Sequence, residues 1–148
     1  MTRDVVYRHH HLFSYRHHDV HVEGDDYKKN QEVLQTRQDT AIREILDSHG
    51  IDGALRFSEM VEVPGMVGFA LGSIADNMLD ETLLPSVINS ETRSHRTVVE
   101  YYVARRFKIG GWTWCERLDR STWSEQQIGE FLTYFPFENE TWSRVTNW

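Results

Sequence analysis

Histidine side chains concentrate in one stretch of the chain, RHHHLFSYRHHDVHVE at residues 8–23. Most of the eight histidines fall there: His9, His10, His11, His17, His18 and His21. Imidazoles and carboxylates are common ligands of divalent transition metals. Whether these side chains meet depends on how two strands, predicted over 4–13 and 19–23, pair with each other.

One pairing of these two strands would build a metal site. In an antiparallel pair, the position numbers of facing residues add up to a constant. If that constant is even, His11 faces His21 and His9 faces Glu23, so that all four side chains share one face of the hairpin. Such a set would bind a divalent transition metal, which activates a bound water molecule in hydrolytic or oxygen chemistry.

The other pairing separates the histidines. If the constant is odd, Phe13 faces Val20, and His9 and His11 lie among apolar neighbours while the other ligands turn outward. Hydrophobic burial favours this register, because apolar residues occupy odd positions in the first strand and even positions in the second. We therefore expect solvated or hydrogen-bonded histidines, and a metal-dependent enzyme remains the alternative.

Two further groups of side chains could do chemistry. Cys115 is the single cysteine, and Arg106, its predicted neighbour across a hairpin, would lower its pKa. Asp76 and Asp80 share a helix face beside Glu81, although carboxylates near a helix start more often complement the helix dipole. The chain contains no phosphate-binding loop and no GxGxxG, HExxH, GxSxG or paired CxxC motif.

The strongest prediction of local structure is a β-hairpin over 96–118. Gly110-Gly111 separates two alternating runs, which is typical of a tight hairpin turn. In that register Phe107 faces Trp114 on one side of the hairpin. The opposite side would carry Tyr102, Arg106, Lys108, Thr113, Cys115 and Arg117.

The cationic and aromatic residues of this hairpin predict a binding surface. Single-stranded nucleic acid binds to such surfaces, but the net charge of −7 opposes it. Arginine and aromatic side chains are also the usual anchors of protein interfaces. We expect a protein partner, or a second copy of the chain, to contact Tyr102, Arg106, Lys108, Trp112, Trp114, Arg117, Trp142 and Trp148.

The remaining elements complete an α+β pattern. Helices are predicted over 25–48, over 74–84 and, for about 13 residues, from a capping box at Thr122 and Glu125. Residues 54–63 alternate like a half-buried strand, and 64–73 fit either a short buried strand or a close-packed loop. The order β-β-α-β-(β)-α-β-β-α predicts a mainly antiparallel sheet with helices packed on one face.

Length and composition narrow the functional class. The 148 residues, 39% of them hydrophobic, predict a single globular domain over 1–148. No apolar run is long enough to span a membrane, no secretory signal begins the chain, and one cysteine suits the cytoplasm or a virion assembled there. We expect a non-enzymatic protein-interaction domain, either an assembly subunit or a regulator or inhibitor of a larger partner. A viral or mobile-element accessory protein fits this description.

Overall fold

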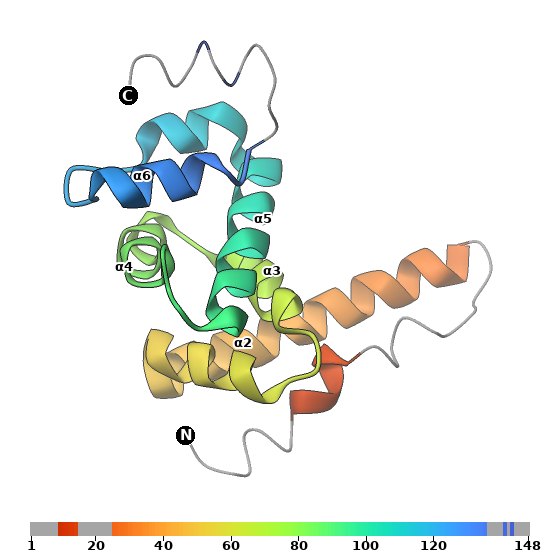
Figure 1. Cartoon of the computed structure of the whole chain (residues 1–148). Coiled ribbons are helices and arrows are strands. Elements are labelled where there is room, and N and C mark those ends of the chain that lie inside the picture. Colours follow the sequence, from red (N-terminus) through yellow and green to blue (C-terminus); the bar gives the residue numbers. More distant parts are fainter. Residues whose placement is uncertain (1–8, 15–24, 136–140, 142, 144–148) are drawn as a thin grey trace.

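The computed structural model describes residues 9–14, 25–135, 141 and 143, and its regular elements are all helical (Figure 1). They are η1 (His10–Phe13), α2 (Asp25–Met60), α3 (Pro64–Ile74), α4 (Asn77–Val87), α5 (Arg93–Arg117) and α6 (Glu125–Leu132). The prediction of an α+β fold with an antiparallel sheet is therefore wrong, since the described residues contain no strand. None of the described helices is long and apolar enough to cross a lipid bilayer.

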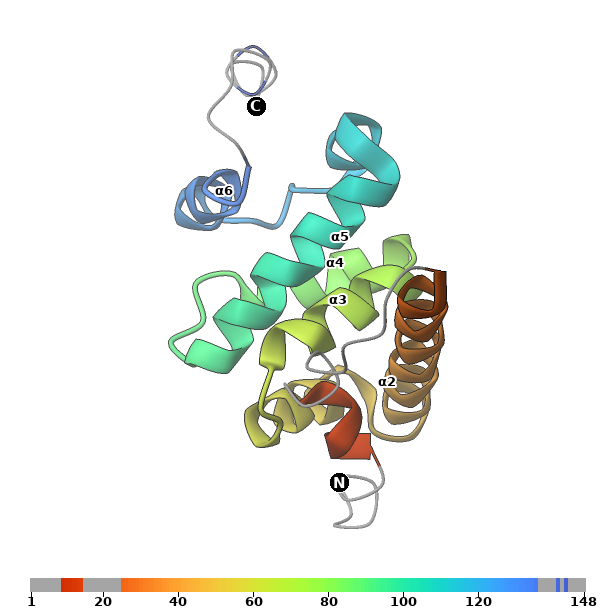
Figure 2. The same ribbon diagram turned by 90° about the vertical axis from the view of Figure 1, so that its right-hand side faces the viewer.

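The main helix contacts of the fold involve α3. Figure 2 shows α3 between α2 and α5, and the most extensive helix contacts join α3 to α5 and α3 to α2. The short turn η1 rests on α2 and α3, and α4 contacts α5. The first half of α2 extends beyond the other helices in Figure 1.

Residues 54–60, predicted as most of a strand, form the end of α2 instead. The buried residues at this end of the helix and just beyond it are Ala54, Leu55, Phe57, Ser58 and Val61. Their spacing of three and four is that of a helix face. The strand prediction rested on the large apolar residues alone and did not count the small buried side chains of Ala54 and Ser58. Ser58 tolerates burial because its hydroxyl donates to the carbonyl oxygen of Leu55 at 2.5 Å.

The first part of α2 confirms the helix predicted over 25–48. Gly50, predicted to end that helix, kinks it instead, and the helix then continues to Met60. Its φ of 68° and ψ of −167° belong to a backbone region that glycine adopts far more readily than other residues.

The predicted hairpin over 96–118 is also wrong, because these residues lie almost entirely within α5. The buried side chains of this helix are Val98, Val99, Tyr102, Val103, Trp114 and Cys115. The first four repeat at intervals of three and four, as on one face of a helix. Gly111, with a φ of 59° and a ψ of −154°, bends the chain between two helical segments rather than between two strands.

The segment predicted as a strand or a loop forms α3, and its glycines allow the closest approach between helices. Pro64 begins α3, a position at which proline is favoured. Gly65, Gly68 and Gly72 share one face of the helix. A Cβ atom on Gly68 would lie 2.1 Å from the carbonyl oxygen of Val98 in α5. The face without side chains therefore lets the two backbones approach.

The predicted capping box occurs in α6, but at Ser124 and Gln127 rather than at Thr122 and Glu125. The Gln127 backbone N–H donates to Ser124 Oγ at 3.1 Å, and the Ser124 N–H donates to Gln127 Oε1 at 2.9 Å. The side-chain amide of Gln127 also donates to the carbonyl oxygen of Pro85 at 2.9 Å. The cap therefore also connects α6 to α4.

An aromatic cluster joins α6 to the end of α5. Trp112 stacks on Phe135 with their ring centroids 5.4 Å apart, and Phe107 meets both of these rings edge-on. Phe131, which is fully buried, lies between Phe135 and Trp123. Phe131 of α6 also lies near Trp114, in the segment of α5 that follows Gly111, with their ring centroids 6.3 Å apart.

Candidate functional site

The predicted histidine site falls partly outside the described residues, since His21 and Glu23 lie there. His9 is described, and its Nε2 lies 3.0 Å from Oε2 of Glu44 in α2. His11 is exposed in η1, which is a 3-10 turn and not part of a strand. The hairpin prediction is therefore wrong for residues 10–13. Among the described residues, no three His, Cys, Asp or Glu side chains form a group that could hold a metal ion.

Cys115 is buried in α5. Burial raises the pKa of its thiol to about 12, and the charge of Arg120 offsets only part of that rise. Arg106, which was expected to lower this pKa, pairs with Asp80 instead. The thiol is therefore protonated at neutral pH, which does not suit a nucleophile.

We expect Cys115 to react slowly with an aromatic disulfide reagent at pH 8. From thiolate content alone, the native rate should be on the order of 1,000-fold below that of the unfolded chain. Reaction in denaturant measures the unfolded rate, and a similar native rate would contradict the buried placement. The raised pKa also means that this thiol's contribution to stability is complete below the unfolded pKa of 9.0 and is lost as the pH rises towards about 12.

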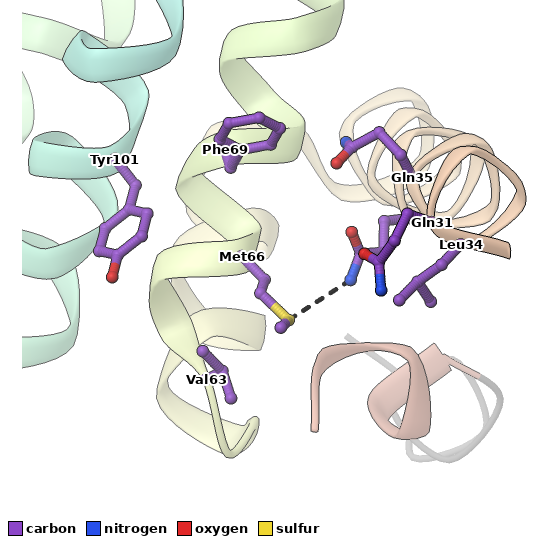
Figure 3. Close-up of a pocket in the computed structure, with 8 residues that line it drawn as sticks. Gln31, Leu34, Gln35, Val63, Met66, Phe69 and Tyr101 are labelled. Carbon is purple, nitrogen blue, oxygen red and sulfur yellow. Dashed lines mark hydrogen bonds between the residues drawn. The ribbon is translucent and has the colours of Figure 1, made fainter. Parts of the chain in front are cut away.

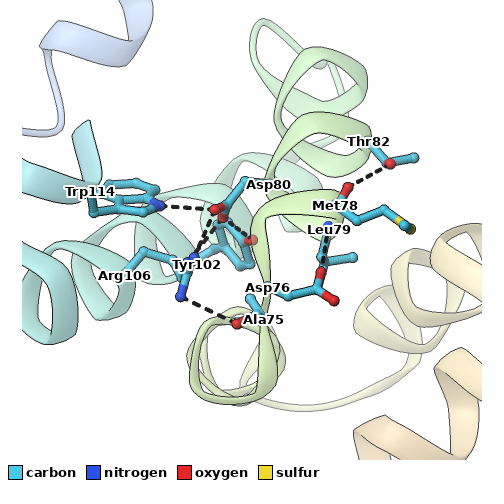
Figure 4. Close-up of polar contacts among 9 residues, drawn as sticks. All are labelled: Ala75, Asp76, Met78, Leu79, Asp80, Thr82, Tyr102, Arg106 and Trp114. Carbon is cyan, nitrogen blue, oxygen red and sulfur yellow. Dashed lines mark hydrogen bonds and ion pairs between the residues drawn. The ribbon is translucent and has the colours of Figure 1, made fainter. Parts of the chain in front are cut away.

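The carboxylate of Asp80 forms the centre of a buried polar cluster between α4 and α5 (Figure 4). Its Oδ1 accepts from the Tyr102 hydroxyl at 2.5 Å and from Arg106 Nε at 3.0 Å. Its Oδ2 accepts from Arg106 Nη2 at 2.8 Å and from Trp114 Nε1 at 2.9 Å. Arg106 Nη1 donates in addition to the carbonyl oxygen of Ala75 at 3.3 Å.

The electrostatics of the Asp80 cluster keep its donors protonated. Burial, reinforced by the charge of Asp80 and the hydrogen bond to it, raises the pKa of Tyr102. Burial alone would lower the pKa of Arg106, but the hydrogen bonds and charge of Asp80 outweigh it, so the pKa is raised. With four donors, the carboxylate has about as many partners as it can accept. The cluster therefore ties α4 to α5 and leaves no free acceptor for a substrate.

The residues predicted to bind a partner are divided by the structure. Tyr102, Arg106 and Trp114 belong to the Asp80 cluster, where both aromatic side chains are buried. Trp112 is partly buried in the aromatic cluster, and Lys108 and Arg117 are exposed on α5. Trp142 and Trp148 lie outside the described residues. Of the six described residues, Tyr102 and Trp114 are therefore buried, while Lys108 and Arg117 remain exposed.

A different site opens between α2 and α3, as a pocket of about 340 Å³ (Figure 3). We call it the glutamine pocket, and its lining consists of Gln31, Leu34, Gln35, Gln38, Val63, Met66, Phe69 and Tyr101. In Figure 3 Gln31 and Gln35 come from α2, while Met66 and Phe69 come from α3. The pocket thus forms where two helices from different parts of the sequence pack together.

Two of the three glutamines are held by hydrogen bonds. The amide of Gln38 donates to the carbonyl oxygen of Leu12 at 2.7 Å, which fastens η1 to α2. The amide of Gln35 donates to Oδ1 of Asp39 at 2.6 Å. Within the described part of the chain, Gln31 has no side-chain hydrogen bond, so its amide can pair with a ligand.

The sequence contained part of the signal for the glutamine pocket. Gln31, Gln35 and Gln38 follow intervals of four and three on the helix that was predicted over 25–48, so they share one face. The opposite wall could not be predicted, because Met66 and Phe69 were assigned to a strand or a loop. The pocket was missed for this reason.

A scan against protein-family models gave no match for this chain, and searches of the curated proteins and of the solved structures gave none either. The function is therefore inferred from the geometry of the chain itself.

Proposed function

We propose that this protein is a non-enzymatic protein-interaction domain whose glutamine pocket binds a peptide segment of its partner. The lining carries this proposal: neutral amides stand beside apolar side chains, and Tyr101 supplies the one ionisable group among the described lining residues. Ligand sites commonly combine an apolar lining with a few well-placed polar groups. A volume of about 340 Å³ suits a short segment better than a folded domain.

The chemistry of the lining indicates what kind of segment it would bind. The amide of Gln31 can both donate and accept a hydrogen bond, so it can pair with the N–H and the C=O of an extended peptide backbone. Met66 is flexible and polarisable, and methionine adapts to differently shaped apolar side chains. We therefore expect an uncharged segment that inserts one or two apolar side chains.

The exposed ring of Tyr101 forms one edge of the glutamine pocket. Its side chain is 47% exposed although the ring is large. The ring lies against Gly65, where a Cβ atom would come within 2.6 Å of it. The absence of a side chain at Gly65 therefore leaves room for the Tyr101 ring at this edge, where it could contact a bound apolar side chain.

The proposal is tested by selecting peptides from a displayed random library against the full chain. A selected peptide is then mapped by NMR chemical-shift changes, which should centre on the lining residues of α2 and α3. Gln31→Ala should weaken that peptide about threefold to tenfold through lost hydrogen bonds. Gln126→Ala, at an exposed glutamine of α6, is the matched control and should leave the affinity unchanged. Enrichment of no peptide, or shifts centred elsewhere, would contradict the proposal.

The two alternatives predicted from the sequence gain no support from the described residues. Nucleic-acid binding required a sheet face with Arg106, Lys108 and Arg117, but Arg106 is paired with Asp80 and no sheet is present among these residues. The metal-dependent enzyme required two paired strands, one of which would include the turn at residues 10–13. Neither function is proposed for this chain.

A further inference from the structure

We infer that a second site, formed by the kink of α2 and the start of α4, binds a positively charged amphipathic helix of a partner protein. This acidic groove has a volume of about 320 Å³. The apolar side chains that line it are Leu46, Ile51, Ile74, Met78 and Leu79. Two carboxylates, Asp47 and Asp76, also line it. The inference does not depend on the glutamine pocket, with which the groove shares no lining residue.

The apolar part of the acidic groove is accessible to a ligand. Met78 is 75% exposed, the largest exposure among the big apolar side chains of the described residues. Figure 4 shows it on the side of α4 that faces away from Trp114 and the Asp80 cluster. A methionine in this position can fold over differently shaped side chains, and grooves of this kind hold the apolar face of an amphipathic helix.

The charge of the acidic groove selects a cationic partner. Asp47 and Asp76 are both exposed, and among the described residues neither forms an ion pair. One oxygen of Asp76 caps α4 by accepting the Leu79 N–H at 2.9 Å, and the side chain remains exposed. Arg43 also lines the groove, so two carboxylates and one guanidinium leave its charged lining residues with a net negative charge. The net charge of −7 for the chain adds to the attraction of a basic segment.

The walls of the acidic groove are held in place before any ligand binds. The Asp80 cluster fastens α4 to α5, on the side of α4 opposite Met78 (Figure 4). On the other side, Gly50 turns α2 through the kink, so that Asp47 and Ile51 come from either side of the bend. A preformed site loses less entropy when its ligand binds.

The test is a titration of the full chain with a labelled synthetic helix of about 18 residues, about five turns, with leucines on one face and lysines on the other. Binding is followed by fluorescence anisotropy at low and at physiological salt. The double variant Asp47→Asn/Asp76→Asn should bind about threefold to tenfold more weakly. Asparagine is also a good helix cap, so α4 should persist in the double variant. A thermal unfolding midpoint equal to that of the original chain would verify this.

The control variant removes the same charge elsewhere, through Glu91→Gln and Glu125→Gln at two exposed glutamates outside the groove. It should change the affinity by less than about twofold. An equal loss in both variants would show diffuse attraction to an acidic protein and would overturn the inference. Equal binding of a peptide with glutamates in place of lysines would also overturn it.

A separate experiment tests whether the apolar side chains of the acidic groove contribute to binding. Met78→Ser should weaken the leucine–lysine peptide, and spermine, which has charge but no apolar face, should bind much more weakly than the peptide does. Gln31→Ala should leave this peptide's affinity unchanged, so failure here is distinguishable from failure of the glutamine pocket. An unaltered affinity in Met78→Ser would refute a groove that recognises an amphipathic ligand.

Discussion

Replacing Asp80 by alanine is expected to lower the free energy of unfolding by about 3–5 kcal/mol, because it leaves a charged guanidinium buried without its partner. Asp80 is 1% exposed and the side chain of Arg106 is 12% exposed, so water cannot replace the lost carboxylate fully. The Tyr102 hydroxyl and the Trp114 indole N–H lose their acceptor in the same change. This loss is a large part of the free energy of unfolding of a typical domain, which is about 5–15 kcal/mol.

Urea unfolding, followed by tryptophan fluorescence and circular dichroism, measures the effect of Asp80→Ala. Glu81→Ala is the matched control, since Glu81 is exposed in the same helix, and it should change stability by less than about 0.5 kcal/mol. The double variant with Arg106→Ala should lose less than the sum of the single variants, by about 0.5–3 kcal/mol. Additive effects, or an Asp80 variant as stable as the Glu81 variant, would refute the cluster.

Replacing Gly68 by alanine is expected to lower the free energy of unfolding by about 3 kcal/mol, although alanine is the better helix former. The added Cβ atom would lie 2.1 Å from the backbone oxygen of Val98 and 2.9 Å from its Cα. Backbone atoms cannot rotate out of the way as a side chain can. The substitution must therefore force α3 and α5 apart along the main helix contact of the fold.

Gly129→Ala is the control for Gly68→Ala. Gly129 lies in α6, and an added Cβ atom there would meet nothing within 4 Å. This variant should become more stable, by about 0.5–1 kcal/mol, because alanine loses less backbone entropy in a helix. The urea concentrations at the unfolding midpoints of Gly68→Ala and Gly129→Ala measure the two effects. If both shift in the same direction, helix propensity and not close packing governs Gly68.

The two proposed binding sites differ in the chemistry that they would recognise. The glutamine pocket offers amides and apolar surface, so its affinity should depend little on salt. The acidic groove offers carboxylates beside its apolar lining, so its affinity should fall as salt rises. Salt dependence therefore tells which of the two sites a newly found partner occupies.

The prediction of strands over 54–63 and 96–118 was wrong for a definable reason. Each segment has a run that alternates in polarity, and each also has buried residues at intervals of three and four. In the first segment small residues such as Ala54 and Ser58 complete the helical stripe, and a hydrophobicity count gives them little weight. A local hydrophobicity pattern cannot distinguish the strand period of two residues from the helix period of about 3.6 residues when some of the buried side chains are small.

The surroundings of Asp76 and Asp80 show the same limit of prediction from local sequence. The spacing of Asp76 and Asp80 predicted a shared helix face, but Asp76 is the exposed cap residue before α4, whereas Asp80 is buried within the helix. The partners of Asp80 lie between 22 and 34 residues away in the sequence. Such contacts depend on how α4 packs against α5, and a local pattern contains no information about that packing.

By itself the sequence determined the features that depend on neighbouring residues. These are the helix over 25–48 and the change of backbone direction at Gly50. A capping box does precede α6, but two residues later than predicted, and the change of direction at Gly111 lies inside a helix rather than in a hairpin. Only the tertiary structure decided that α3 and α5 are helices, because α3 packs its glycine face against α5 and so buries a helical stripe on each. It also decided which polar groups meet in the Asp80 cluster and which amides line a pocket.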